Sequence, residues 1–304
     1  MRFALTLAAT LATAALHGTA AAGTYGFTVI DAPNALTTAL YALNNDGKVV
    51  GAERDLVTHL HHALVGTRDG VGLLDPSGPV GTATESWAFS VNGHGDIAGM
   101  VADASGAHHG YLHHADGRYE PIDFPGATST EAYGVNDRQD VIGVYTAADG
   151  SEHAFTRRHG HYATADLAGG LATIPLSIND AGTIVGEFVQ TPDTIGYGFI
   201  EHKDGRFQLA SDPDAPPEST YYISINNRHQ VVGVYADSDG NAHNFVRKGG
   251  ADVPFDVPQA WGATLVSAQT INDFGDIVGY YVDGNNGVHG YFAAARAGRP
   301  EAAR

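Results

Sequence analysis

Short apolar runs of four to six residues follow one another along almost the whole chain, separated by polar turn residues, mainly Asn, Asp and Gly. The clearest set occupies residues 131–136, 140–145, 153–157 and 162–166. These runs are rich in β-branched and aromatic residues, which favour strands over helices. The pattern predicts a unit of four short antiparallel strands joined by tight turns.

The unit is repeated six times. An Asn is followed seven residues later by a Gly in every repeat, and successive glycines are 48, 44, 43, 47 and 46 residues apart. This period lies in the range of about 40 to 50 residues that is typical of β-propeller blades. We therefore predict an all-β, six-bladed β-propeller with four-stranded antiparallel blades. The repeated pairs are Asn44/Gly51, Asn92/Gly99, Asn136/Gly143, Asn179/Gly186, Asn226/Gly233 and Asn272/Gly279.

The two ends of the chain indicate how the ring closes. The last repeat ends after its third strand, at residues 289–293, and has no fourth strand of its own. The segment Phe27–Ala35 matches the fourth strand of the second repeat and the turn after it, Tyr119–Ala127. We expect the N-terminal strand to complete the last blade, which leaves no free edge for pairing with another chain. Residues 23–295 then form one domain, which we expect to be monomeric.

A His-Ala-Phe tripeptide, His153-Ala154-Phe155, opens the predicted third strand of the third repeat. The repeats resemble the extracellular HAF-repeat family, which is named for this tripeptide. The resemblance covers nearly all of residues 25–293 and implies an exported repeat protein, but no particular activity. The fourth repeat departs from the pattern with Tyr197, and the other repeats have variants that begin at His62, His109, His243 and His289.

Composition narrows the possible partners. The formal net charge is −18, from 34 acidic and 16 basic residues, and no basic run offsets it. Such a charge repels phosphate backbones, which argues against nucleic acid and anionic membranes as partners. The chain has no cysteine, so neither disulfides nor thiolate metal sites are available.

The N-terminus has the pattern of an export signal. Arg2 precedes an apolar stretch, Phe3–Leu16, and the run Ala20–Ala22 fits a cleavage site. We predict a signal peptide at residues 1–22 and a secreted or periplasmic mature protein. This apolar stretch is too short to span a bilayer as a helix, and no second candidate follows it. Residues 296–304 are expected to form a disordered tail.

The repeated residues have structural explanations. The Asn can tolerate a left-handed backbone or form an Asx-turn between the first and second strands. The Gly, which lies in the second strand, permits neighbouring blades to approach closely. We expect each repeated His to be half-buried and to hydrogen-bond a loop carbonyl of its own blade.

Two groups of residues are candidate metal ligands. His59, His61, His62, His108 and His109 lie in or beside loops of neighbouring blades, where imidazoles could bind Zn, Cu or Ni. The alternative is that they are ordinary polar loop residues, and the absence of a ligand motif favours it. The loops 237–241 and 283–286 have acids at calcium-like spacing, but tight turns explain them equally well. No metal or cofactor is therefore predicted.

The residue five positions before each Asn lies near the start of the innermost predicted strand. Here we find Trp87, Glu131 and Tyr221, and Trp261 lies in a linker opening on the same face. Flat rings that stack on sugars and polar groups that orient them are typical of carbohydrate sites. These four residues are our candidate ligand-binding set at the channel mouth. Glu53 and Glu187 interrupt second strands but should point to opposite blade surfaces, so they do not form one catalytic pair.

Two classes of function remain. The first is a non-catalytic binding or scaffold module for an extracellular glycan or protein, which fits the absence of any recognised catalytic motif. The alternative is a carbohydrate-active enzyme with its site at the channel mouth. It would be a polysaccharide lyase with a His or Tyr base, or a glycoside hydrolase with paired carboxylates.

Overall fold

The computed structural model describes residues 24–74, 83–190, 196–210, 220–239 and 241–296. This part of the chain is all-β, with 24 strands and one short 3-10 helix, Gln259–Trp261. It contains no helix long and apolar enough to cross a bilayer. The predicted signal peptide and residues 297–304 of the predicted tail lie outside the described residues.

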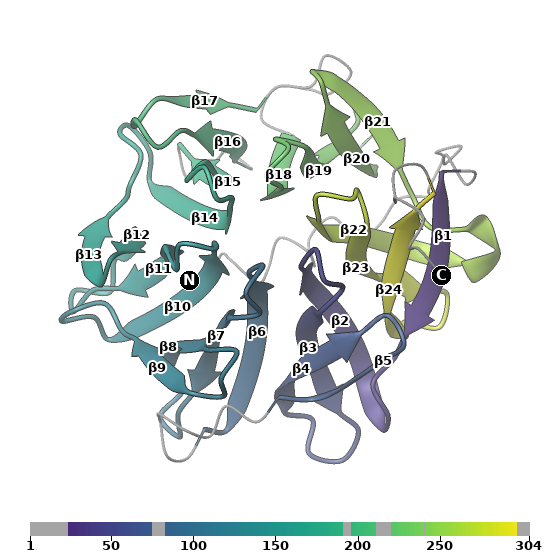
Figure 1. The fold of residues 1–304 in the computed structure, drawn as a ribbon, viewed down its shortest axis with the longest axis horizontal. Coiled ribbons are helices and arrows are strands. Elements are labelled where there is room, and N and C mark those ends of the chain that lie inside the picture. Colours follow the sequence, from purple (N-terminus) through teal and green to yellow (C-terminus); the bar gives the residue numbers. More distant parts are fainter. Residues whose placement is uncertain (1–23, 75–82, 191–195, 211–219, 240, 297–304) are drawn as a thin grey trace.

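The strands form four-stranded antiparallel units arranged around a central axis (Figure 1). In each of the first five units the strands pair in chain order, and the first strand lies innermost. Units 1 and 2 consist of β2 (Ala35–Leu43), β3 (Val49–Asp55), β4 (His61–Thr67) and β5 (Gly70–Leu73), then β6 (Glu85–Val91), β7 (Ile97–Ala102), β8 (His108–His113) and β9 (Tyr119–Ile122).

The remaining units follow the same order. Units 3 and 4 consist of β10 (Ser129–Val135), β11 (Val141–Thr146), β12 (Glu152–Arg158) and β13 (His161–Thr164), then β14 (Ala172–Ile178), β15 (Ile184–Val189), β16 (Tyr197–Glu201) and β17 (Phe207–Leu209). Unit 5 consists of β18 (Thr220–Ile225), β19 (Val231–Ala236), β20 (Ala242–Lys248) and β21 (Ala251–Phe255). The four-stranded antiparallel sheets predicted from the sequence are confirmed, with bounds that differ by one or two residues in the third repeat.

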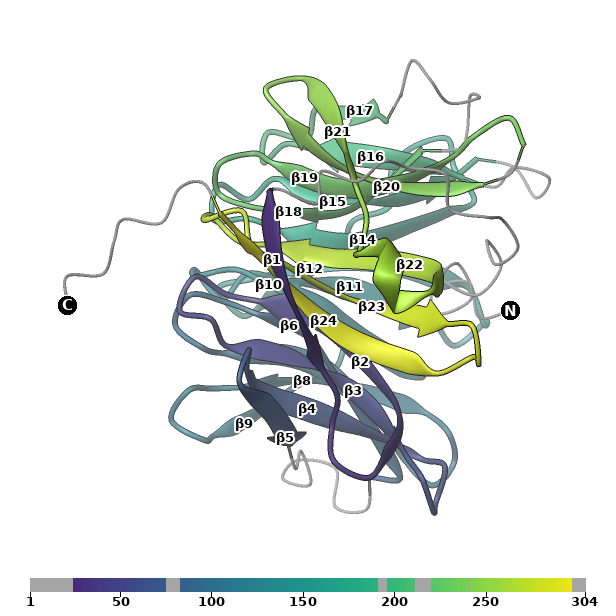
Figure 2. The same ribbon diagram turned by 90° about the vertical axis from the view of Figure 1, so that its right-hand side faces the viewer.

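The sixth unit is completed by the N-terminal strand, as predicted. It contains β22 (Ala263–Ile271), β23 (Ile277–Asp283) and β24 (Val288–Ala295), and β1 (Tyr25–Ile30) pairs antiparallel with β24. Figure 2 shows β1 and β24 running side by side. Units 6 and 1 belong to one eight-stranded sheet, joined by the single parallel pair Thr37 and Val288. The other four units are separate sheets.

The hydrophobic core lies between neighbouring units. Phe155 of unit 3 packs with Leu112 and Ile122 of unit 2, and this arrangement recurs around the ring. The third residue of the tripeptide is the central core residue, because it is at most 1% exposed in all six units. These six residues are Leu64, Tyr111, Phe155, Phe199, Phe245 and Tyr291.

The repeated Asn closes the ring of units. In every unit its Oδ1 accepts a hydrogen bond from the backbone N–H four residues later, at 2.8 to 3.0 Å, which forms the predicted Asx-turn. Its Nδ2 donates to the backbone carbonyl of the Asn in the next unit, at 2.9 to 3.3 Å. Asn272 completes the circle by donating to Asn44. We call these six residues the Asn ring.

The repeated Gly accommodates a β-bulge within its own unit. Opposite each Gly, the pairing of the innermost strand skips the residue three positions before the Asn, for example Tyr133 between Ala132 and Gly134. A Cβ on Gly143 would collide with the backbone carbonyl of Glu131, and the other five glycines face the equivalent carbonyl. The predicted role in blade-to-blade packing is therefore wrong, because the close approach is to the paired strand.

A first prediction concerns the Asn ring. Asn179→Asp keeps the oxygen that caps the turn but removes the Nδ2 donor to the Asn226 carbonyl. Because that carbonyl keeps only the backbone N–H of His229 as donor and a carboxylate oxygen then faces it, we expect a loss of about 1 to 3 kcal/mol of unfolding free energy. Thermal unfolding measures it. The control is Asn34→Asp at an exposed position. Equal melting temperatures for both variants would contradict the role of the ring.

A second prediction concerns closure by β1. Deleting residues 23–35 removes β1 and exposes the edge of β24, so we expect a large loss of stability and a tendency to aggregate. The control is deletion of residues 297–304. A melting temperature within about 3 °C of the full-length protein, where 1 kcal/mol corresponds to roughly 2 to 4 °C, would contradict closure.

Candidate functional site

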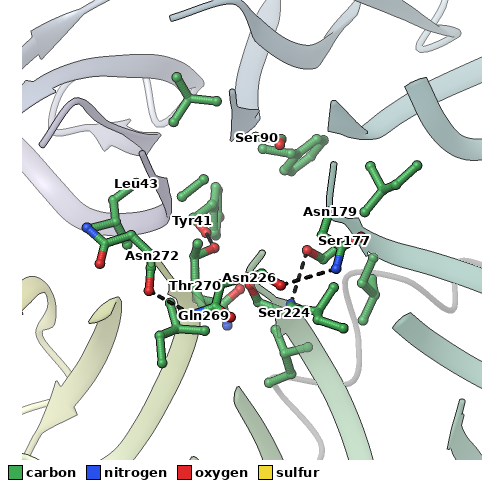
Figure 3. A pocket seen from close by; sticks show the side chains of 18 of the residues that line it. Tyr41, Leu43, Ser90, Ser177, Asn179, Ser224, Asn226, Gln269, Thr270 and Asn272 are labelled. Carbon is green, nitrogen blue, oxygen red and sulfur yellow. Dashed lines mark hydrogen bonds between the residues drawn. The ribbon is translucent and has the colours of Figure 1, made fainter. Parts of the chain in front are cut away.

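A cavity of about 370 Å³ occupies the centre of the ring. Most of its described lining comes from the innermost strands of all six units and the turns that follow them (Figure 3). Second strands add a few residues, such as Val234 and Tyr280. Side chains of Tyr41, Ser90, Ser177, Ser224 and Gln269, each from a different unit, surround the same central space in the close-up. The ring of units therefore encloses a space to which every unit contributes.

The six residues at the β-bulges all line this cavity. A bulge leaves one residue out of the strand pairing and turns its side chain away from the regular alternation, which explains this placement. We call these residues the bulge ring: Tyr41, Phe89, Tyr133, Leu176, Ile223 and Gln269.

Half of the bulge ring is an aromatic wall. The ring centroids of Tyr41 and Phe89 are 5.7 Å apart, and those of Phe89 and Tyr133 are 5.3 Å apart in an edge-to-face arrangement. Units 4 to 6 contribute Leu176, Ile223 and Gln269 instead. The cavity therefore presents flat apolar rings on one side, with aliphatic groups and an amide on the other.

A carboxylate and an imidazole lie behind Tyr133. Its hydroxyl donates to Glu131, and the other oxygen of this carboxylate lies 2.6 Å from Nδ1 of His108 in unit 2. Burial, and then the charge of Glu131, raise the pKa of Tyr133 well above its ordinary value of 10.0. The phenol therefore stays protonated near neutral pH, which suits a hydrogen-bonding role and not that of a base.

One end of the cavity carries carboxylates. The residue after each repeated Asn lines the cavity, and three of these six residues are Asp137, Asp180 and Asp273. Each aspartate accepts a hydrogen bond from the backbone N–H of the equivalent residue in the preceding unit, at 2.5 to 2.8 Å. They thus reinforce the Asn ring and make this end of the cavity negative.

Glu187 supplies a fourth carboxylate. It follows the repeated Gly in β15 and is 5% exposed. Its cross-strand partner Ile174 also lines the cavity, so both side chains lie on the cavity side of the sheet. Burial raises the pKa of Glu187 from 4.5 to about 7. The cavity wall therefore contains an acid that titrates near neutral pH.

The structure separates the ligand-binding residues predicted from the sequence. Tyr221 lines the cavity and is 2% exposed, whereas Trp87 and Glu131 are absent from its described lining. Trp87 is buried in a hydrophobic cluster and stacks on His61, with centroids 5.0 Å apart. The expected channel-mouth position is wrong for Trp87 and Glu131, although the equivalent residues of units 4 to 6, Ile174, Tyr221 and Ser267, do line the cavity.

Trp261 also lies away from the cavity. Its ring packs on Tyr281, with centroids 4.9 Å apart, and on Phe27 of β1 at 5.8 Å. It thereby helps to hold β1 against the sixth unit. Glu53 and Glu187 lie on opposite faces of their sheets, as their pairing positions predict, and only Glu187 lines the cavity.

The histidines that were candidate metal ligands do not converge. The described residues include no group of three or more His, Asp or Glu side chains placed to hold a metal ion. His59 is exposed in a loop and His62 begins the third-strand tripeptide in β4. The other three pair with separate carboxylates: His61 with Glu85 at 2.8 Å, His108 with Glu131 at 2.6 Å and His109 with Asp123 at 3.3 Å.

In four units the repeated His pairs with a carboxylate of its own unit, where a loop carbonyl was expected. His153 Nδ1 lies 2.7 Å from Asp166, and its Nε2 lies 2.8 Å from Ser151. The acidic loops form turns: Asp237 and Asp283 each accept two hydrogen bonds from backbone N–H groups of the following residues. These groups therefore stabilise loops.

No family model and no curated protein matches the sequence. Solved structures are similar in fold. AofleA from Arthrobotrys oligospora aligns over 90% of this chain and 87% of its own, with a TM-score of 0.56 at 13% identity. The fucose-specific lectin from Aleuria aurantia aligns over 92% and 98%, with a TM-score of 0.51 at 11% identity.

A further structure of the Aleuria aurantia lectin, described as a six-bladed β-propeller with a novel fucose recognition mode, has a TM-score of 0.51 at 9% identity. It covers 92% of this chain and 98% of its own. At these identities the similarity establishes a shared propeller-like fold alone.

A third prediction follows from the pKa of Glu187. Because this pKa is higher in the folded than in the unfolded protein, the folded state holds an extra proton between pH 4.5 and about 7. Stability therefore falls as the pH rises through this window. Glu187→Gln does not titrate, so it should be more stable than the wild type at pH 8, by on the order of 3 kcal/mol.

At pH 4 the stability of Glu187→Gln and of the wild type should be similar. Urea unfolding at the two pH values measures the difference, with the exposed Asp69→Asn as control. A Glu187→Gln variant that is less stable than the wild type at pH 8 would show that the carboxylate has a stabilising partner.

Proposed function

We propose that the chain is an exported six-bladed β-propeller that binds a glycan without chemically altering it, with the central cavity as its binding site. The blade count follows if units 6 and 1, which share one sheet through a single bridge, are counted as two blades. Export rests on the signal-like N-terminus and on the resemblance to HAF-repeat proteins.

The observation that carries the proposal is the bulge ring. Sugars present a flat C–H face and a rim of hydroxyl groups, so a site for them combines aromatic rings with small polar groups. Tyr41, Phe89 and Tyr133 provide the rings. Hydroxyl and amide groups of Ser90, Ser177, Ser224, Ser267 and Gln269 line the same cavity. The fucose-specific lectin among the similar structures lends support at the level of fold.

The chemistry of the cavity favours binding over catalysis. Its described lining includes no His, Lys or Arg, and the tyrosine beside Glu131 stays protonated because its pKa is raised. A lyase needs a base and a positive group to offset the uronate carboxylate of its substrate, whereas this lining has four carboxylates. These features argue against the lyase alternative. Carboxylates alone would suit a glycoside hydrolase, but three of the four accept backbone hydrogen bonds that link neighbouring units, so we favour the non-catalytic module.

A fourth prediction tests the aromatic wall. Phe89→Ala removes the central ring, so affinity for neutral oligosaccharides selected on a glycan array should fall by roughly a factor of five, or about 1 kcal/mol. Isothermal titration calorimetry of the purified mature protein measures it. Phe274→Ala, at a half-buried Phe outside the described lining, is the matched control.

If no oligosaccharide binds, or if both phenylalanine variants bind as the wild type does, the cavity is not a glycan site. Equal losses in the two variants would indicate general destabilisation, and would also count against the assignment.

A further inference from the structure

Glu187 is an acid that the fold itself does not require. The residue after the repeated Gly occupies the same place in every unit, and the other five units have no charge there. The other five units have an uncharged residue at this position and still pack into the ring, so packing of the ring does not explain a carboxylate in unit 4. These residues are Ala52, Met100, Val144, Val234 and Tyr280.

The surroundings of Glu187 leave it without an obvious counter-charge. Only 5% of Glu187 is exposed, and burial alone raises its pKa. The described residues form no ion pair with its carboxylate. A Cβ on Gly196 would come within 2.9 Å of Glu187 Oε1, so the glycine leaves room for the carboxylate. A buried acid in this state is costly unless something pairs with it.

The charges of the cavity indicate what that partner is. The described lining contains four carboxylate side chains and no Lys, Arg or His. The four are Asp137, Asp180, Glu187 and Asp273. The whole chain carries a formal charge of −18. An anionic sugar is therefore repelled and a cationic one attracted. The aromatic wall is compatible with both a sugar face and an ammonium group.

We propose that the cavity selects a saccharide with a free, protonated amine, that is, an unacetylated amino sugar, and that Glu187 is the counter-ion of this amine. The inference rests on the proposed glycan-binding function and specifies its ligand class. The ammonium group would donate to the Glu187 carboxylate, while the sugar ring lies against the Tyr41, Phe89 and Tyr133 wall. N-acetylation removes the charge and with it this pairing.

The test compares a glucosamine trimer with its N-acetylated counterpart by calorimetry at pH 7.5. We expect the wild type to bind the unacetylated trimer at least about tenfold more tightly. Glu187→Gln should reduce this preference to about twofold or less. The matched control is Glu53→Gln, which changes the net charge equally at a buried glutamate outside the described lining.

Each outcome has a distinct meaning. If both trimers bind equally to the wild type, or if Glu187→Gln keeps the preference, the inference is overturned and the glycan-binding function stands. If Glu53→Gln loses the preference as well, attraction by the net charge explains it and the assignment of Glu187 fails. If neither trimer nor any neutral oligosaccharide binds, the proposed function itself fails.

Discussion

The central cavity depends on one hydrogen bond that is made six times, from the Asn side chain of one unit to the Asn backbone carbonyl of the next. These side chains are 2 to 6% exposed, so both the donor and the carbonyl need a partner inside the protein. The same side chain also caps the turn of its own unit. Because one residue holds a turn and a neighbour together, the six turns cannot move independently, and the innermost strands are fixed around the axis.

The spacing of Asn and Gly links that ring to the bulge. Seven residues after the Asn, the chain has returned along the second strand to the point opposite the bulge, where a Cβ would collide with a carbonyl of the first strand. The bulge in turn directs Tyr133 and its five equivalents toward the axis. The constant spacing of Asn and Gly in the sequence therefore reflects two structural requirements. The Asn hydrogen-bonds the next unit, and the Gly allows the bulge that places one side chain on the cavity.

This linkage explains what could be predicted from the sequence. Period, turn residues and the matching ends of the chain are local or repetitive signals, so the four-stranded units and the pairing of β1 with β24 were predicted. The candidate site was only partly predicted, with Tyr221 on the cavity and Trp87 away from it. Our prediction used the residue five positions before each Asn and did not foresee the bulge, which places the residue three positions before the Asn on the cavity in all six units. The repeated Gly opposite the bulge was the available signal.

Variation among the units separates residues that build the ring from residues that can give it a function. The Asn and Gly positions are identical in all six units because every unit needs the same hydrogen bond to its neighbour and the same space opposite its bulge. The residues of the bulge ring differ between units: three units have aromatic residues there, and the other three have Leu, Ile and Gln. Glu187 departs further, as a single acid at a position that is otherwise uncharged. A sixfold arrangement of identical contacts has no preferred direction, so any asymmetry of the cavity has to come from positions that differ between units. The differences between units therefore give the cavity an aromatic side in units 1 to 3, an aliphatic and amide side in units 4 to 6, and one buried glutamate in unit 4.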